Sequence, residues 1–325
     1  MSLDVHPVVQ ALAKARNDPG AMKTTTMTFA IFFGDGEGAD WVRGRTRALA
    51  EKHPSRVVIL DANKDETEQS VEPPQKRGEW IEIGVKGANA AELDAALTQL
   101  SLPEAPVVLL WIAEALSEDD RFMTLARRSD TTICSTSVAR TDDGALRDLA
   151  HFVELHPDTL IQDVAYLRLT AWQELVAEFF DDPDDRVELD GLRSVDVTAG
   201  SDAEMYYMLG WIASRLRWTL TDAQTFASPG GGNVKFTMTH DGPPRRLSKI
   251  ALASEHATFT ASVIPDDQNA IALDVTGPSP SSRFAPLHTV DLASLVERAI
   301  LTTTRDDVFM DALSMTKAMM EKRSA

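Results

Sequence analysis

The sequence predicts two domains: a doubly wound, mostly parallel α/β domain over residues 1–160, then an α+β domain over residues 161–325 with an antiparallel meander packed against helices. Three observations support this fold class. The chain has 325 residues, and a single hydrophobic core is usually found in shorter chains. Unbroken apolar runs separated by helix-length stretches dominate the first half, as in parallel sheets covered on both faces. Strict alternation of apolar and polar residues dominates the second half.

The first domain is predicted to begin with a helix over residues 4–16, which ends at the breaker Asn17-Asp18-Pro19-Gly20. Residues 62–78 are polar and contain Pro73 and Pro74, so we expect a long surface loop there. Apolar runs predict buried strands at residues 27–33, 56–61, 80–85, 106–112 and 130–135. Helical spacing predicts helices at residues 41–52, 88–100, 118–128 and 144–155.

The second domain is marked by a change of rhythm after His156-Pro157. Helical stretches at residues 171–180 and 203–218 flank an extended segment at residues 186–197. Alternating runs predict the strands of a one-sided antiparallel meander at residues 234–239, 249–253, 258–263 and 271–275. The helices available to cover its apolar face begin near Ala203, Asp291 and Asp307.

Composition excludes several classes of protein. The 43% hydrophobic and 25% charged residues are typical of a globular chain, and the net charge of −18 argues against a nucleic-acid or anionic-membrane binder. No apolar run reaches membrane-spanning length and the first twenty residues lack an export signal, which predicts a cytoplasmic protein. Cys134 is the one cysteine, and the histidines lack metal-ligand spacing, so neither an internal disulfide nor a metal site is expected.

The glycine loop Gly34-Asp35-Gly36-Glu37-Gly38-Ala39 is the strongest enzyme-like signal. It follows a predicted strand, precedes a predicted helix and matches G-x-G-x-x-[G/A], while Asp61 ends the next strand at the offset of a ribose-binding acid. Gly34, Gly36 and Asp61 are therefore candidate cofactor-binding residues. The loop's two carboxylates would oppose a pyrophosphate, so a tight strand-to-helix turn without a ligand is the alternative.

Tryptophan and arginine residues form a second constellation. Arg168 and Trp172 precede and open one helix, and Trp211, Arg215 and Trp218 are spaced at i, i+4 and i+7, which predicts one helical face. Such side chains combine large contact area with fixed donors, as at interface hot spots. The alternative is that the tryptophans anchor the core of the second domain.

Four segments of the chain resemble the signature stretches of the OpcA family, whose members are known as glucose-6-phosphate dehydrogenase assembly proteins: residues 53–60 (HPSRVVIL), 105–111 (APVVLLW), 163–175 (DVAYLRLTAWQEL) and 209–218 (LGWIASRLRW). In order and spacing the resemblance runs from about residue 24 to residue 310. It implies a non-catalytic protein without a cofactor that binds glucose-6-phosphate dehydrogenase and promotes its assembly or allosteric activation. Some relatives are linked to redox control through cysteine pairs, a pattern that this chain departs from.

The resemblance places the family's motif positions on a defined set of residues: Arg168, Trp172, Trp211, Arg215 and Trp218. Two alternatives remain. One is a nucleotide- or sugar-phosphate-binding enzyme that uses the loop Gly34–Ala39 and Asp61. The other is a ligand-binding module in which Lys235, Lys249 or Arg283 holds a sugar phosphate that joins the complex with the dehydrogenase.

Overall fold

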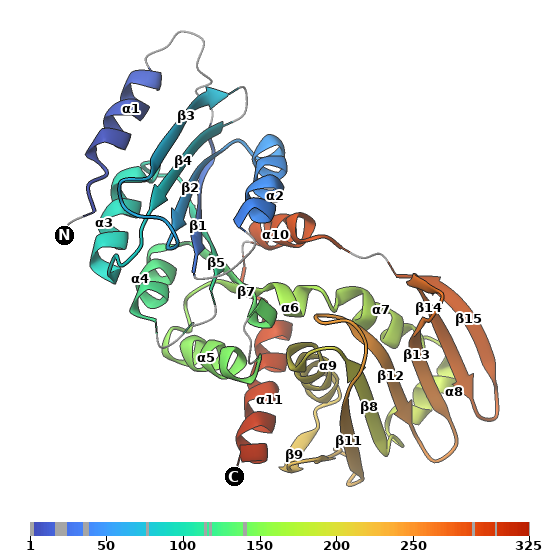
Figure 1. Ribbon diagram of the computed structural model, residues 1–325. Coiled ribbons are helices and arrows are strands. Elements are labelled where there is room, and N and C mark those ends of the chain that lie inside the picture. Colours follow the sequence, from blue (N-terminus) through green and yellow to red (C-terminus); the bar gives the residue numbers. More distant parts are fainter. Residues whose placement is uncertain are drawn as a thin grey trace. The chain divides into compact units, whose positions relative to one another are not determined.

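The computed structural model describes residues 3–16, 25–34, 39–75, 78–113, 116, 119–138, 142–287, 290–302 and 304–324 (Figure 1). The chain divides into two compact units, each with one β-sheet. The first unit comprises Met1–Arg140, His151–Val164 and Asp291–Arg305, and the second comprises Thr141–Ala150, Ala165–Val290 and Asp306–Ala325. Both units draw on segments from either side of residue 160, and the single boundary there stays a prediction.

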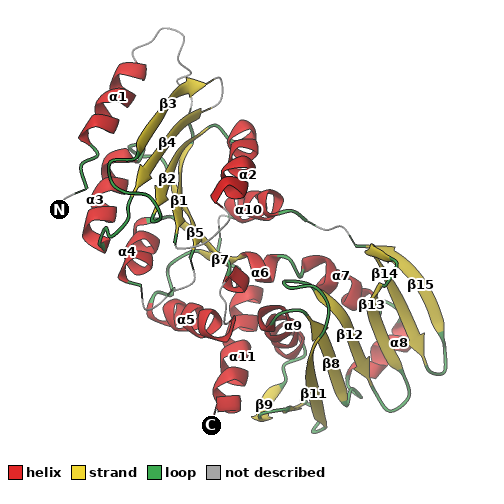
Figure 2. Cartoon of the chain, in the orientation of Figure 1, coloured by secondary structure: helices red, strands yellow, loops and turns green. Residues whose placement is uncertain are grey.

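The first sheet has the order β3-β4-β2-β1-β5-β6-β7, and every neighbouring pair except β3–β4 is parallel (Figures 1 and 2). Without β3, the remaining strands have the order typical of dinucleotide-binding folds, and the order reverses between β1 and β5. The doubly wound prediction is confirmed. The strands are β1 Met27–Phe33, β2 Ser55–Asp61, β3 Gln69–Gln75, β4 Gly78–Gly84, β5 Val107–Ile112, β6 Thr131–Cys134 and β7 Ile161–Asp163.

Helices cover the two faces of this sheet: α1, α3 and α4 lie on one side, and α2 and α10 lie on the other (Figure 2). Asn89 caps α3 in a reciprocal capping box with Glu92, and Asp119 caps α4, so the sequence itself marks where both helices begin. The helices are α1 His6–Arg16, α2 Ala39–Lys52, α3 Ala90–Leu100, α4 Asp120–Arg128 and α10 Leu292–Leu301; α5, Asp142–Leu155, contributes residues to both units.

One expectation for this sheet is wrong. The segment predicted as a long loop, residues 62–78, contains the antiparallel strand β3. Its prolines, Pro73 and Pro74, fall where the register with β4 shifts, between Glu72 and Gln75. Proline is tolerated at such irregularities and on edge strands because its missing N–H need not join the ladder, so a polar, proline-containing strand shows no clear sequence signal.

The second sheet has eight strands in the order β15-β14-β13-β12-β8-β11-β10-β9. Strands β12 to β15 pair successively in antiparallel fashion, so an antiparallel meander is confirmed, and it contains three of the four predicted strands. The strands are β8 Ser194–Ala199, β9 Thr219–Asp222, β10 Thr225–Ala227, β11 Asn233–His240, β12 Leu247–Ala253, β13 Thr258–Ile264, β14 Asp267–Thr276 and β15 Ser281–Pro286.

The strand order differs from the expectation at one place. β11 does not pair with β12, because β8 lies between them, parallel to β11 and antiparallel to β12. Alternation along β8 buries Val195, Val197 and Ala199 on the same side as the meander's apolar residues. The period of two identifies which side chains face the core, but it carries no information about which strand is the neighbour.

The helices of the second unit are α6 Val164–Leu167, α7 Thr170–Glu178, α8 Pro183–Arg186, α9 Asp202–Arg215 and α11 Asp307–Ser324. α9 and α11 pack together at Gly210, where a β-carbon would lie 2.4 Å from the carbonyl oxygen of Ala312. The expectation that the helix near Asp291 covers this sheet is wrong, because α10 packs in the first unit against α2 and β6. Among the described residues, no helix has the length and apolar character needed to cross a membrane.

Candidate functional site

Gly34, the first glycine of the candidate nucleotide loop, is held by the neighbouring strand. Its N–H donates to the carbonyl oxygen of Ile112 at 2.8 Å, and a β-carbon at this position would lie 2.5 Å from that of Ala113. The close approach of β1 and β5 therefore requires glycine here, whether or not a ligand binds. Gly36 lies outside the described residues.

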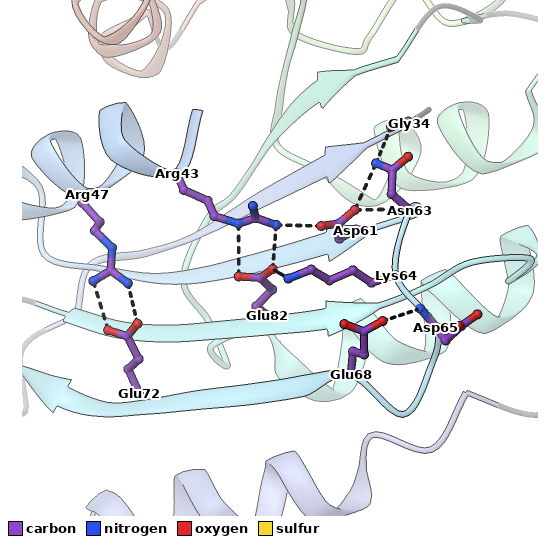
Figure 3. A network of polar contacts seen from close by, with 10 residues as sticks. All are labelled: Gly34, Arg43, Arg47, Asp61, Asn63, Lys64, Asp65, Glu68, Glu72 and Glu82. Atoms are coloured by element: carbon purple, nitrogen blue, oxygen red, sulfur yellow. Dashed lines mark hydrogen bonds and ion pairs between the residues drawn. The ribbon is translucent and has the colours of Figure 1, made fainter. Parts of the chain in front are cut away.

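Asp61 ends β2 with its carboxylate buried, and Figure 3 shows which groups surround it. One oxygen, Oδ2, accepts from Nη2 of Arg43 at 2.6 Å. The other, Oδ1, accepts from the backbone N–H and the side-chain amide of Asn63 at 3.0 and 3.1 Å. A ribose hydroxyl would have to compete with these three donors, so the acid is engaged within the protein.

Glu82 on β4 extends this network across the sheet. Its carboxylate accepts from Nε and Nη2 of Arg43 at 3.2 and 2.7 Å and pairs with Nζ of Lys64 at 2.5 Å (Figure 3). The two acids and two bases occupy the carboxyl ends of β2 and β4, where the ribose-binding groups of a dinucleotide domain would lie. Their arrangement ties α2 to the sheet, because Arg43 bridges Asp61 and Glu82.

One turn later on α2, Arg47 makes a second tie. Its two terminal nitrogens, Nη1 and Nη2, donate to the carboxylate of Glu72 on β3 (Figure 3). Its guanidinium also lies over the ring of Trp80, 4.4 Å from the centroid. The hydrogen bond from Arg47 lowers the pKa of the Glu72 carboxyl. Arg43 and Arg47 of α2 thus both pair with acids on the strands of the sheet.

Aromatic side chains fill the point where the strand order reverses. Phe32 on β1 is in register with Trp111 on β5, and their buried rings stack with centroids 4.1 Å apart. Phe122 packs edge-on against Trp111. Cys134, the predicted small buried residue, ends β6 with no exposed surface, and burial raises the pKa of its thiol well above the usual value.

In the second unit, Arg168 and Trp172 have structural partners. Nη1 of Arg168 donates to Oε1 of Glu204 at 2.8 Å, and Glu204 is fully buried. Ser201 donates to the other oxygen of Glu204 at 2.5 Å. Trp172 is buried in α7. Sequence reasoning did not select Glu204, although the Ser201-x-x-Glu204 spacing of a capping box before α9 was a visible signal for it.

The expectation that Trp211, Arg215 and Trp218 share one helical face is wrong. α9 ends at Arg215, Arg217 has a positive φ of 56°, and the N–H of Trp218 bonds back to the carbonyl of Ala213 at 2.8 Å. This Schellman-type ending reverses the chain, and Trp218 packs against Phe226 in the core. Trp211 is half-buried, and Arg215 is exposed and paired with Asp311.

The three candidate phosphate-binding residues, Lys235, Lys249 and Arg283, lie on three different strands. Lys235 and Lys249 lie on exposed positions of β11 and β12, opposite Ser194 and Thr198 of the intervening strand β8. Arg283 on β15 pairs with Glu178 of α7 at 2.7 Å. Among the described residues, no group of three or more histidine, cysteine or acidic side chains is arranged to hold a metal ion.

Several solved structures with a similar fold are oxidoreductases. A 3-ketoreductase from Actinomadura kijaniata, KijD10, solved with NADP, aligns with a TM-score of 0.54 and 11% identity over 91% of this chain and 97% of that chain. A levoglucosan dehydrogenase, solved with NADH and L-sorbose, aligns with a TM-score of 0.50 and 10% identity over 90% of this chain and 97% of that chain. At such identities the likeness shows the fold alone.

Sequence relatives are more specific. An OxPP cycle protein OpcA from Synechocystis is 31% identical over 193 residues, which are 54% of this chain and 40% of the relative. The OpcA of Synechococcus elongatus is 29% identical over 62% of this chain and 44% of the relative. The chain therefore spans less than half the length of the curated relatives that it matches.

Two family models match successive parts of the chain. The N-terminal domain of the OpcA glucose-6-phosphate dehydrogenase subunit matches residues 46–151, and the C-terminal domain of the same subunit matches residues 159–313. These matches include the acids Asp61 and Glu82 and the helix α9, whereas Arg43 lies before the matched residues. They confirm the resemblance found in the sequence. This chain belongs to the OpcA family of glucose-6-phosphate dehydrogenase subunits.

Proposed function

We propose that this protein is a non-catalytic accessory factor that binds glucose-6-phosphate dehydrogenase and stabilises its assembled, active arrangement. The observation that carries the proposal is the pair of OpcA subunit models matched in tandem over residues 46–151 and 159–313. The buried ion-pair network at Asp61 supports the non-catalytic part, because this acid is already bonded to Arg43 and Asn63. The site of action is the compartment of the dehydrogenase, the cytoplasm.

An activator of this kind acts through differential affinity. It must bind the active arrangement of the dehydrogenase more tightly than the inactive one, since equal affinity for both shifts no population. A coupling free energy of about 1–3 kcal/mol corresponds to a change of about 5- to 150-fold in apparent substrate affinity. A specific complex should bury an interface of at least about 1,000 Å², with aromatic or arginine side chains as anchors.

Within the motif, the side chains divide into two roles. Trp172 and Trp218 are buried and stabilise the second unit, and Arg168 holds the buried Glu204. Trp211 and Arg215 reach the surface of α9, and we assign the partner contact to these two. A half-buried indole beside an exposed guanidinium has the composition of an interface hot spot.

The test is to mix the purified protein with its cognate dehydrogenase. We expect co-elution on size-exclusion chromatography and a lower glucose 6-phosphate concentration for half-maximal rate. Trp211→Ala should weaken both effects, while Phe284→Ala, which removes an exposed ring on the edge strand β15, should leave them unchanged. Unchanged kinetics without co-elution would reject the proposal.

The second candidate function is a nucleotide-dependent enzyme that uses the loop Gly34–Ala39 and Asp61. The strand order of the first sheet favours it. It requires saturable NADH or NADPH binding that Gly36→Asp abolishes, whereas the accessory proposal expects a flat titration at millimolar cofactor. A saturable binding curve that the Gly36→Asp variant loses would replace the accessory proposal with the enzyme.

A further inference from the structure

The second unit contains a cavity that none of the sequence motifs indicated. Its volume is about 270 Å³, and it lies between the start of α9, the end of α11, the β9–β10 turn and β11. The lining residues are Tyr206, Asp222, Ala223, Gln224, Phe236, Met238, Met319 and Arg323. All of them belong to one compact unit.

The apolar wall of the cavity is fixed by the surrounding core. Phe236 and Met319 are almost fully buried, and the ring of Phe236 stacks on Phe226 at 4.8 Å, which in turn contacts the motif residue Trp218. The close contact of α9 with α11 at Gly210 sets the distance between the two helices. The apolar wall therefore combines a packed phenyl ring with adaptable thioether side chains, which suits the C–H face of a small ligand.

A cationic, an anionic and an uncharged polar side chain also line the cavity. Arg323, in the last turn of α11, contributes a guanidinium, and its Nη1 lies 3.3 Å from the hydroxyl of Tyr206. Asp222 and Gln224 are exposed residues of the β9–β10 turn, where Oδ1 of Asp222 accepts from the N–H of Gln224 at 2.9 Å. The carboxylate and the side-chain amide supply acceptors and donors for ligand hydroxyls, and the guanidinium suits an anionic oxygen.

We propose that this cavity binds a phosphorylated monosaccharide. The phosphate would face Arg323, the sugar hydroxyls would face Asp222 and Gln224, and the C–H face would lie on Phe236 and Met238. The size supports this class, because 270 Å³ is slightly below the ~300–1,000 Å³ of pockets for drug-sized ligands and too small for a dinucleotide. This inference goes beyond the proposed function and holds or fails independently of it, since it concerns the isolated chain.

The experiment uses the full chain labelled with ¹³C at its methionine methyl groups, and glucose 6-phosphate as the probe. Met238 and Met319 line the cavity, whereas Met27 lies on β1 of the first unit and serves as the internal reference. We expect saturable movement of the Met238 and Met319 signals, assigned through Met238→Leu and Met319→Leu, without movement of Met27. Glucose should bind at least about tenfold more weakly, because it lacks the anionic group.

Arg323→Gln should weaken binding of glucose 6-phosphate by about tenfold or more, and the matched control Lys322→Gln, in the same helical turn, by no more than about twofold. Gln224→Ala, in an exposed turn, is a second variant that leaves the core intact. Signals that do not move, equal affinity for inorganic phosphate or for glucose, or equal effects of Arg323→Gln and Lys322→Gln would overturn the proposal. Failure here leaves binding to the dehydrogenase untouched, because that assay has a separate readout.

Discussion

The carboxyl end of the first sheet and the cavity of the second unit use charged side chains in different ways. At the first, Arg43 reaches two carboxylates, Asp61 and Glu82, and Lys64 completes the charge balance within hydrogen-bond distance. At the second, Arg323 and Asp222 line a space of about 270 Å³. A sheet with the strand order typical of dinucleotide binding can thus have ion pairs at the carboxyl ends of its strands, while the cavity lies in the other unit of the chain.

The largest expected effect concerns the ion pairs that Arg43 makes with Asp61 and Glu82 in the first unit. Arg43→Met leaves the buried carboxylate of Asp61 without its cation, and removal of one partner from a buried pair is strongly destabilising. We expect a loss of about 3 kcal/mol in the free energy of unfolding, measured by urea denaturation. Arg45→Met on the same helix, which removes an exposed pair with Asp291, should cost less than about 1 kcal/mol. Equal losses for both variants would contradict the bracing role.

The next effect concerns the helix pair beside the cavity. Gly210→Ala places a β-carbon 2.4 Å from the carbonyl oxygen of Ala312, so α9 and α11 must move apart, at a cost of about 1–3 kcal/mol. Gly44→Ala on α2 is the control, since nothing lies within 4 Å of its new β-carbon, and it should stabilise the protein by about 0.5–1 kcal/mol. If Gly210→Ala leaves the urea midpoint unchanged, the close helix contact does not define the cavity.

A smaller effect is expected at the turn that brings Trp218 into the core. Arg217 has a φ of 56°, a conformation that glycine adopts without strain, so Arg217→Gly should raise the free energy of unfolding by about 0.5–1 kcal/mol. Arg215→Gly, within α9, should lower it by about 1 kcal/mol. Thermal unfolding of both variants distinguishes the two positions, and a loss of stability in Arg217→Gly would contradict the assigned turn.

The smallest effect is at the exposed contact between α2 and α10 of the first unit. Hydrogen bonds from Lys52 and His53 lower the pKa of Glu297 below its ordinary value of 4.5. Because the pKa of Glu297 is lower in the folded state, the contact stabilises α10 at pH values above the unfolded-state pKa. This contribution disappears as the pH falls through the folded-state pKa. Amide exchange in α10, corrected for the intrinsic rate, should therefore accelerate below pH 4.5 in the native chain and change less in Glu297→Gln.

How much the sequence could predict differs between these regions. Apolar runs were sufficient for β1, β2, β4, β5 and β6, because buried parallel strands have a strong local signal. They were insufficient for β3, whose prolines resemble a loop, and for the position of β8 between β11 and β12, which is a long-range pairing. The cavity had no sequence signal, since Tyr206, Gln224 and Arg323 come from three distant segments.

The candidate residues show the same limit. Asp61 was selected by its offset from the glycine loop, but its pairing with Arg43 depends on the position of one arginine on α2, the helix that precedes β2. Trp218 was placed on the face of α9 because the helical spacing continued, whereas the positive φ of Arg217 ends that spacing. Local patterns therefore selected candidate residues but carried no information about the partners of those residues.

The central claim is tested most directly by linkage. If this protein raises the affinity of glucose-6-phosphate dehydrogenase for glucose 6-phosphate, the substrate must tighten the complex between the two proteins by the same factor. The dissociation constant of the complex is measured by calorimetry with and without saturating glucose 6-phosphate. The same measurement with the Arg323→Gln variant distinguishes an effect of substrate on the dehydrogenase from an effect of ligand bound in the cavity. The account predicts a complex about 5- to 150-fold tighter with substrate for both chains. An unchanged dissociation constant, or no complex at all, would contradict it.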